Sequence, residues 1–189
     1  MKKTSELFKS SLKELKNLKV LCTLGVLGAL SIILYTVTIQ LGNFIQLGFD
    51  PVCNLMADLL FGPVAGGIFG GAMDMLNFFL NPRGSFVPGL TLNAILSGFF
   101  VGSMLYKRKP TAKRLIPVLL IDHLVFNAFL GTLWLCLSYG SGMLAYFPTR
   151  LLSNLVKPFV ETAIILLLHT ALERSGLLQM LRQPFGKRG

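Results

Sequence analysis

The sequence contains few charged residues. Asp, Glu, Lys and Arg make up 14% of its 189 residues, whereas an average globular domain carries about 25%. Hydrophobic residues make up 53% of the chain, and the mean hydropathy is +0.66. So few charges do not cover the surface of a soluble domain of this length. The composition therefore predicts an all-α integral membrane protein that crosses the bilayer several times.

The sequence also lacks the motifs of several enzyme classes. It has no G-x-x-x-x-G-K-[ST] phosphate-binding loop, no H-E-x-x-H zinc signature and no G-x-S-x-G nucleophile turn. Its two histidines, His123 and His169, and its three cysteines show no metal-ligand spacing. We therefore expect no catalysis, no metal site and no cofactor in this chain, which leaves binding or passage of a solute.

Long uncharged runs define the expected membrane spans. A helix needs about 20 apolar residues to cross a hydrocarbon core of about 30 Å. Proline and turn residues mark the ends of these runs, and Pro63 makes the second span short. The expected spans are 20–41, 50–61, 64–80, 88–106, 115–137 and 148–172. The sequence therefore predicts a compact bundle of six transmembrane helices.

The basic residues orient this bundle. The formal charge of +10 includes 18 Lys and Arg, and fifteen of them lie before the first span, between the fourth and fifth, or after the last. They are Lys2, Lys3, Lys9, Lys13, Lys16, Lys19, Lys107, Arg108, Lys109, Lys113, Arg114, Arg174, Arg182, Lys187 and Arg188. The positive-inside rule places all three segments, and both termini, in the cytoplasm. The expected organisation is a basic tail at 1–19, a membrane domain at 20–173 and a second basic tail at 174–189.

The first tail is similar to the basic region of a signal peptide. The apolar run behind it is too long and has no A-x-A cleavage site, so we expect no processing. Phe8, Leu12, Leu15 and Leu18 recur at helical spacing, which predicts an amphipathic helix on the inner leaflet. A solvated basic tail is the alternative interpretation.

Polar residues recur at helical spacing on five of the six spans. Arg150, Asn154, Lys157 and Glu161 stand at i, i+4, i+7 and i+11, so they share one helix face. The other stripes are Asp50, Asn54 and Asp58; Asp74, Asn77 and Asn81; Gly89, Asn93 and Ser97; and His123, Asn127, Gly131, Trp134 and Ser138. Polar groups at membrane depth usually face the interior of a bundle. We therefore expect these stripes to converge.

Two interpretations apply to the acidic and histidine side chains of the stripes. Asp58, Ser97, Asp122 and His123 either belong to a functional site or only link helices through hydrogen bonds. A weaker hypothesis is an intramembrane enzyme that uses Asp74, Asp122 and His123.

Arg150, Lys157 and Arg83 are the three cations that topology does not explain. Arg150 and Lys157 lie toward the outer end of one stripe, and a desolvated cation normally has a counter-charge. A bound anionic ligand is one candidate, and a structural ion pair, with Asp50 as the nearest partner by topology, is the other.

The first span differs from the rest because it carries no charge. Gly25 and Ala29 are four residues apart, with Gly28 beside them. Small residues at this spacing form a flat strip that lets another helix approach closely. The partner helix lies either within the bundle or on another protein.

Four segments carry a resemblance to a known family. They are Leu59-Leu60-Phe61-Gly62-Pro63 with Gly66-Gly67, Phe86-Val87-Pro88-Gly89-Leu90-Thr91-Leu92, Gly131-Thr132-Leu133-Trp134-Leu135 and Pro148-Thr149-Arg150-Leu151-Leu152-Ser153-Asn154-Leu155. With six short helices and a basic inner surface, they are similar to the S components of energy-coupling factor (ECF) vitamin transporters, specifically the folate-specific members. The resemblance covers about residues 20–165. Gly131 and Ser153 depart from it, because we would expect Asn and Lys there.

The resemblance implies a high-affinity folate-binding subunit of an ECF-type ABC transporter in a prokaryotic cell membrane. Such a subunit captures folate at the outer face and topples within the bilayer to deliver it inward. Its partners are a membrane-embedded coupling (T) subunit and two cytoplasmic ATPases, which use the ATP. Gly25 and Ala29 match the family's helix motif that contacts the coupling subunit.

The residues of the stripes suit the chemistry of folate. Its two glutamate carboxylates need cations, its pterin edge needs an amide or carboxylate, and its pterin faces need aromatic or apolar surfaces such as Tyr139. A loop at 42–50 is a candidate cover. The expected substrate-binding residues are Arg150, Lys157, Asn154, Arg83, Phe86, Asn93, Thr91, Asp74, Asn127, Trp134 and Phe49. Another flat anionic vitamin, or a self-sufficient permease, remains an alternative.

Overall fold

The computed structural model describes residues 8, 10–12, 15–36, 39–41, 45–80 and 85–175. Most of the expected tails therefore lies outside the described residues. The elements are α2 (Leu18–Thr36), β1 (Ile39–Leu41), β2 (Ile45–Leu47), α3 (Asp50–Phe61), α4 (Pro63–Leu80), α5 (Pro88–Leu105), α6 (Ala112–Ile121), a π-helix (Asp122–Leu130), α7 (Gly131–Tyr139), a 3-10 helix (Ser141–Tyr146) and α8 (Phe147–Arg174). Helices α6 and α7 continue through the π-helix as one rod.

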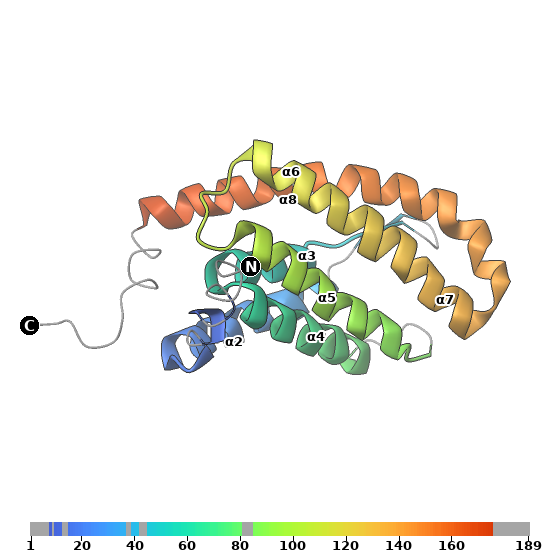
Figure 1. Ribbon diagram of the computed structural model, residues 1–189, viewed down its shortest axis with the longest axis horizontal. Helices are drawn as coiled ribbons and strands as arrows, with labels where there is room; N and C mark the ends of the chain where they lie inside the picture. The colour runs from blue at the N-terminus through green and yellow to red at the C-terminus, as the bar shows by residue number, and fades with distance from the viewer. Residues whose placement is uncertain are drawn as a thin grey trace, which may run out of the picture.

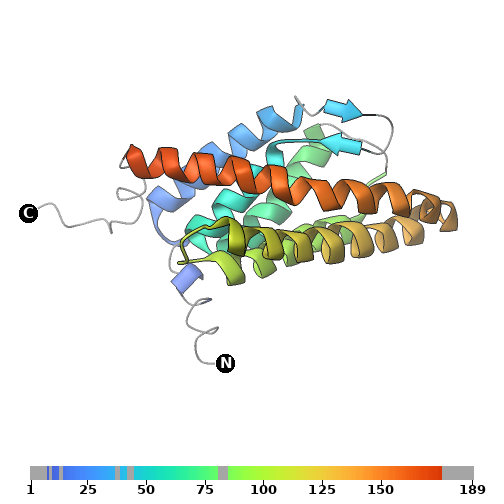
Figure 2. The same ribbon diagram turned by 90° about the horizontal axis from the view of Figure 1, so that it is seen from above.

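The helices run back and forth between two ends of the bundle (Figures 1 and 2). One end holds the start of α2, the α3–α4 junction, the α5–α6 connection and the end of α8. Described basic residues gather there, including Lys19, Lys107, Arg114 and Arg174. The opposite end holds the β1–β2 hairpin, the start of α5 and the start of α8. We call these the basic end and the hairpin end.

Among the described residues, five helical segments are long and apolar enough to cross a membrane. They are Leu18–Thr36, Pro63–Leu80, Pro88–Leu105, Ala112–Tyr139 and Phe147–Arg174. Helix α3 has 12 residues, which corresponds to about 18 Å at 1.5 Å per residue. The bounds of the predicted helices at 50–61, 64–80, 88–106, 115–137 and 148–172 agree with the structure within a few residues.

The prediction of a first helix at 20–41 is wrong at its C-terminal end. Helix α2 ends at Thr36, and the backbone of Ile39–Leu41 pairs antiparallel with Ile45–Leu47. The sequence from Thr36 to Ile39 consists of β-branched residues, which favour extended backbone. Apolarity alone does not distinguish such a strand from the last turns of a helix.

A sharp break at Gly62 separates α3 from α4. Gly62 has φ +88°, a left-handed conformation that strongly favours glycine, and Pro63 starts the next helix. Ser11 from the N-terminal segment closes this break. Its hydroxyl donates to the Phe61 carbonyl at 2.7 Å and accepts the N–H groups of Val64 and Ala65 at 3.1 and 3.2 Å. Ser11 therefore caps the start of α4 from 53 residues away in sequence.

Other contacts hold the N-terminal segment against the bundle. The Phe8 ring stacks on Phe99 at 5.9 Å, and the Ser10 hydroxyl lies 3.0 Å from the Tyr106 hydroxyl. Lys107 Nζ donates to the Ser10 hydroxyl at 2.7 Å. The described residues of this segment thus pack on the helices, which a fully solvated tail would not do.

Glycines allow α4 and α5 to touch through their backbones. A Cβ on Gly98 would lie 2.8 Å from the Gly66 carbonyl carbon, and a Cβ on Gly102 would lie 2.6 Å from Pro63 Cα. No larger side chain fits at these contacts without moving a helix. Helices α4 and α5 therefore form a rigid wall on one side of the bundle.

Candidate functional site

The five polar stripes surround a cavity with two connected parts. The larger part, here called the inner lobe, has a volume of about 420 Å³ and is lined by α3, α4, α5, the π-helix and α8. The smaller part, the outer lobe, has a volume of about 250 Å³, and Tyr35 near the end of α2 and Ser85 and Phe86 before α5 line it toward the hairpin end. The two lobes share Asp50, Asn54, Gly70, Asp74, Leu90 and Ala94. Members of all five stripes line the cavity, so the stripes converge in part, whereas Gly89, Gly131, Trp134 and Ser138 line neither lobe.

Arg150 and Lys157 line the α8 wall of the inner lobe. Arg150 Nη2 donates to the backbone carbonyl of Asn127 at 3.4 Å. Neither cation forms a salt bridge with any carboxylate in the part of the chain that the structure describes. The two cations thus share a half-buried surface, seven residues or about 10 Å apart along the helix.

A pair of buried side chains, His123 and Glu161, lines part of the inner lobe. His123 Nε2 lies 3.2 Å from Glu161 Oε1, and His123 Nδ1 lies 3.0 Å from the Leu119 carbonyl. A carbonyl only accepts hydrogen bonds, so Nδ1 carries a proton. The hydrogen bond between His123 Nε2 and Glu161 Oε1 then joins the π-helix to α8. This geometry supports the interpretation that His123 links helices.

Asp122 and Ser97 form a second link between helices. The Ser97 hydroxyl donates to Asp122 Oδ1 at 2.7 Å, and Asn127 Nδ2 lies 3.4 Å from Asp122 Oδ2. Asn93 Nδ2 donates to the Phe126 carbonyl at 2.8 Å. A π-helix shifts the backbone hydrogen-bond pattern by one residue, and here the carbonyls of Phe126 and Asn127 receive side chains of α5 and α8.

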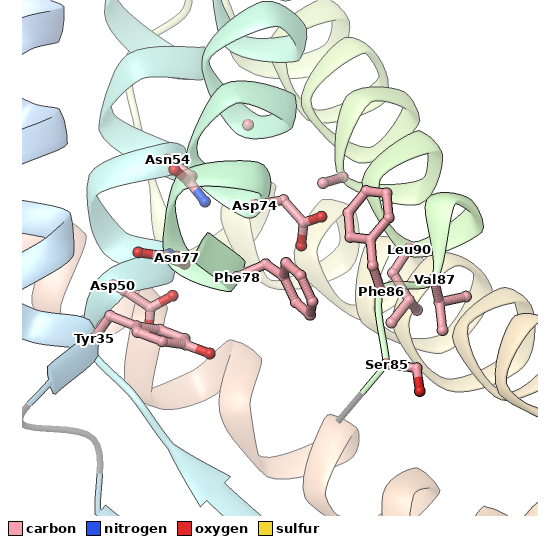
Figure 3. Close-up of a pocket in the computed structure, with 12 residues that line it drawn as sticks. Tyr35, Asp50, Asn54, Asp74, Asn77, Phe78, Ser85, Phe86, Val87 and Leu90 are labelled. Atoms are coloured by element: carbon pink, nitrogen blue, oxygen red, sulfur yellow. The ribbon is translucent and has the colours of Figure 1, made fainter. Parts of the chain in front are cut away.

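The outer lobe combines carboxylates with aromatic rings (Figure 3). Asp50 and Asp74 line it together with Tyr35, Phe78 and Phe86. The rings of Phe78 and Phe86 lie 5.0 Å apart and are tilted by 55°. The Asp74 carboxylate points into the space beside these rings (Figure 3), and its Oδ2 accepts the Thr91 hydroxyl at 2.6 Å.

Most of the expected site residues line the cavity. These are Arg150, Lys157, Asn154, Asn93, Asp74 and Asn127, which line the inner lobe, and Phe86, which lines the outer lobe. Asn93 and Asn154 are almost fully buried, at 6% and 5% exposure. Their amides bond to backbone carbonyls, Asn154 to that of Arg150 at 2.9 Å. These amide nitrogens therefore link the cavity wall to the backbone, whereas Asn93 Oδ1 has no hydrogen-bond partner among the described residues.

The other expected residues lie elsewhere. Trp134 packs against Gly89 at the start of α5 and is not among the residues that line either lobe. Phe49 precedes α3 and is 41% exposed, also outside both linings. Thr91 contacts Asp74 without lining a lobe. Arg83 and residues 42–44 of the expected covering loop lie outside the described residues, so their placement stays a prediction.

The sequence analysis missed several residues of the outer lobe, among them Phe78, Tyr35 and Ser85. Phe78 follows Asp74 by four residues on α4 and so lies on the same helix face. The spacing could have identified it, but the stripes were chosen from polar residues and therefore did not include a phenylalanine. Tyr35 lies near the end of α2, and Ser85 precedes α5. The Tyr139 hydroxyl accepts the Ser85 N–H at 2.7 Å, and Tyr139 does not line either lobe, so its expected contact with a ligand stays a prediction. No sequence pattern singled out Tyr35 or Ser85.

Comparisons of the sequence and of the fold show which known proteins this chain is similar to. A family model described as "ECF transporter, substrate-specific component" matches residues 19–172. The "Folate transporter FolT" of Clostridium novyi (strain NT) is 29% identical over 121 residues, which cover 64% of this chain and 70% of that protein.

Two solved structures have a similar fold. One, described as "Crystal structure of FolT bound with folic acid", has a TM-score of 0.68 and 27% identity, and the match covers 78% of this chain and 89% of that one. The other, described as "Structure and mechanism of the S component of a bacterial ECF transporter", has a TM-score of 0.58 and 25% identity, with coverage of 87% and 98%.

Proposed function

The chain belongs to the substrate-specific components of ECF transporters, and from this premise we propose that it is a folate-binding S component. It is a multi-pass membrane protein of a family that binds transport substrates. Its similarity to a folate transporter and to a structure with bound folic acid supports folate as the substrate. Folate is captured from the outer face and delivered inward.

The α8 wall is the observation that carries this proposal. Arg150 and Lys157 line the inner lobe without a salt bridge to any described carboxylate. Two desolvated cations in one cavity favour an anionic ligand, and the glutamate tail of folate supplies two carboxylates. The planar guanidinium of Arg150 is suited to hold one of them in a bidentate manner.

The proposed topology has six spans, with α3 as a short sixth span in addition to the five longer ones. Helix α3 is mostly buried between other helices, so its short length does not need to match the lipid thickness by itself. The basic end then faces the cytoplasm, in line with the positive-inside rule. The membrane domain spans 20–173, with basic tails at 1–19 and 174–189, and the cavity lies toward the outer face of a prokaryotic cell membrane.

The proposed partners are a membrane-embedded T subunit and two ATPases that use the ATP. Gly25 and Ala29 on α2 are both exposed, and no described atom outside the adjacent backbone of α2 lies within 4 Å of a Cβ placed on Gly25. This strip is therefore not packed against the described part of the bundle. Its flatness suits a helix of the T subunit.

One experiment tests the class of function and the substrate together. The detergent-solubilised protein is purified and denatured, and the ultraviolet spectrum of the released molecule is recorded. We expect a pterin spectrum, and we expect the emptied protein to bind added folate in calorimetry. A protein that releases nothing and also fails to bind folate would refute the proposal. Release of another flat anionic vitamin would retain the S-component assignment and change the substrate.

A reconstitution separates the S component from a self-sufficient permease. Vesicles that contain this chain alone should bind folate and accumulate little of it. Addition of the T subunit and the ATPases with internal ATP should start uptake. Rapid uptake by the chain alone would contradict the division of labour proposed here.

A further inference from the structure

An apolar layer separates the inner lobe from the basic end of the bundle. Val101 lines the lobe, whereas Leu105, one helical turn further along α5, does not. In the same way Leu119 of α6 lines the lobe, whereas Leu115, one turn closer to the basic end, does not. These side chains are at most 2% exposed and pack in one cluster. We call this layer, which is about 5.4 Å or one helical turn thick, the floor of the cavity.

Two irregular connections lie on the basic side of the floor. The α3–α4 break is at Gly62, and the α5–α6 connection begins at Tyr106. They touch, because a Cβ on Gly62 would lie 2.9 Å from the Tyr106 ring. Lys107 has φ +59°, a left-handed conformation that is unfavourable for a residue with a side chain. Such a conformation persists only where the surrounding structure holds it.

Two adjacent residues of the N-terminal segment bind both connections. Ser11 caps the α3–α4 break, with its hydroxyl 2.7 Å from the Phe61 carbonyl oxygen. The Ser10 hydroxyl lies 3.0 Å from the Tyr106 hydroxyl and accepts Lys107 Nζ at 2.7 Å. Lys107 Nζ also lies 5.0 Å from the centre of the Tyr106 ring. These contacts join the two connections and hold Lys107 in its left-handed conformation.

One face of the segment packs along the bundle. Phe8, Ser11 and Leu15 stand at i, i+3 and i+7, so they share a helix face. Phe8 stacks on Phe99 of α5, and Leu15 packs against the apolar cluster of α2, α3 and α4. Leu12, on another face, is 52% exposed. The segment is therefore fixed to the bundle at both of its ends as well as through its two hydroxyl groups.

We propose that the N-terminal segment is a strap that keeps the cytoplasmic end of the cavity closed. It holds the α3–α4 break against the α5–α6 connection and so keeps the floor packed. When the contacts of Ser10 are lost, Lys107 relaxes from its left-handed conformation, the two connections separate, and water reaches the inner lobe through the floor. This inference rests on the proposed topology, in which the basic end faces the cytoplasm.

Thiol labelling from each side of the membrane tests the strap. Val101→Cys places a thiol in the floor of a protein whose three native cysteines are replaced by Ala. A charged, membrane-impermeant thiol reagent is added to inverted vesicles, which expose the cytoplasmic side, or to right-side-out vesicles. We expect Ser10→Ala to raise the labelling rate about tenfold in inverted vesicles, because a hydrogen bond to a charged amine is lost. The rate in right-side-out vesicles should stay unchanged.

Three further variants make the test specific. Ser175→Ala removes an exposed hydroxyl at the same end of the bundle and should leave labelling unchanged. Tyr106→Phe removes the other hydroxyl of the Ser10 contact, so it should speed labelling as Ser10→Ala does, and it replaces that variant if Ser10→Ala does not fold. Lys107→Gly, added to Ser10→Ala, should slow labelling again, because glycine adopts φ +59° without strain and the closed connection then needs the strap less.

Three outcomes would overturn this inference. They are an unchanged labelling rate in folded Ser10→Ala and Tyr106→Phe proteins, an equal increase from both sides of the membrane, and no slowing by Lys107→Gly. An increase confined to right-side-out vesicles would overturn it together with the topology on which it rests. The assay contains no ligand, so a failure to bind folate would refute the proposed substrate and leave the strap unaffected.

Discussion

Replacement of Arg150 by Ala tests the α8 wall most directly. The side chain is partly buried in the inner lobe, and its Nη2 holds the Asn127 carbonyl at 3.4 Å. Loss of one partner of a buried, hydrogen-bonded charge pair costs about 2–5 kcal/mol. Because Arg150 retains some exposure, we expect the lower half of this range, about 2–3 kcal/mol. At about 1.4 kcal/mol per factor of ten, this is a loss of folate affinity of about 30- to 150-fold.

The assay is isothermal titration of the detergent-solubilised, ligand-free protein with folate. Arg174→Ala is the matched control, because Arg174 is an exposed arginine at the other end of the same helix. It should leave the affinity within twofold. Arg150→Lys should bind more weakly than the unmodified protein, since Lys keeps the charge and loses the bidentate geometry. Unchanged affinity in a folded Arg150→Ala protein would remove Arg150 from the site.

Three further changes test the fold and the partner surface. Ser11→Ala leaves the Phe61 carbonyl and two N–H groups of α4 without their partner, so it should lower the stability by about 2–4 kcal/mol in thermal unfolding; a midpoint equal to that of the unmodified protein would contradict the cap. Gly98→Leu should prevent the contact of α4 with α5 and abolish monodisperse elution, whereas Gly142→Ala, which meets no atom within 4 Å, should not. Gly25→Leu should keep folate affinity and reduce uptake by the reconstituted transporter more than tenfold; unaffected uptake would exclude this strip from the interface.

The sequence predicted the helices well because the bilayer fixes their length and composition. Uncharged runs, Pro63 and the loop before Pro88 mark ends that the structure places within a few residues. Apolarity could not predict the end of α2 or the hairpin after it, because strands and helices in apolar surroundings have similar composition. The Ser11 cap was also beyond prediction, since it joins residues 53 apart with no periodic signal.

The sequence predicted some residues of the candidate site correctly and missed others. The reason is that helical periodicity shows only which residues share a helix face. Helical spacing shows which residues share a face, so Asp74, Asn127, Arg150 and Lys157 were placed correctly on the cavity wall. It does not show whether a side chain is already bonded within the protein. Asn93 was expected to contact a ligand, and the spacing did not show that its Nδ2 donates to the carbonyl of Phe126 in the π-helix. A π-helix has no reliable sequence signature, so this partner was not visible.

The distribution of charge in the fold connects topology with binding. Five of the eight Asp and Glu residues line the inner lobe, namely Asp50, Asp58, Asp74, Asp122 and Glu161. The acidic groups are thus withdrawn from the surface, and the basic end keeps a large uncompensated positive charge that favours one orientation in the membrane. The same acidic groups limit where an anion can lie in the cavity, because the α8 wall is the part that offers cations. In the topology and function proposed here, the few charges of this sequence therefore orient both the protein in the bilayer and the ligand within the protein.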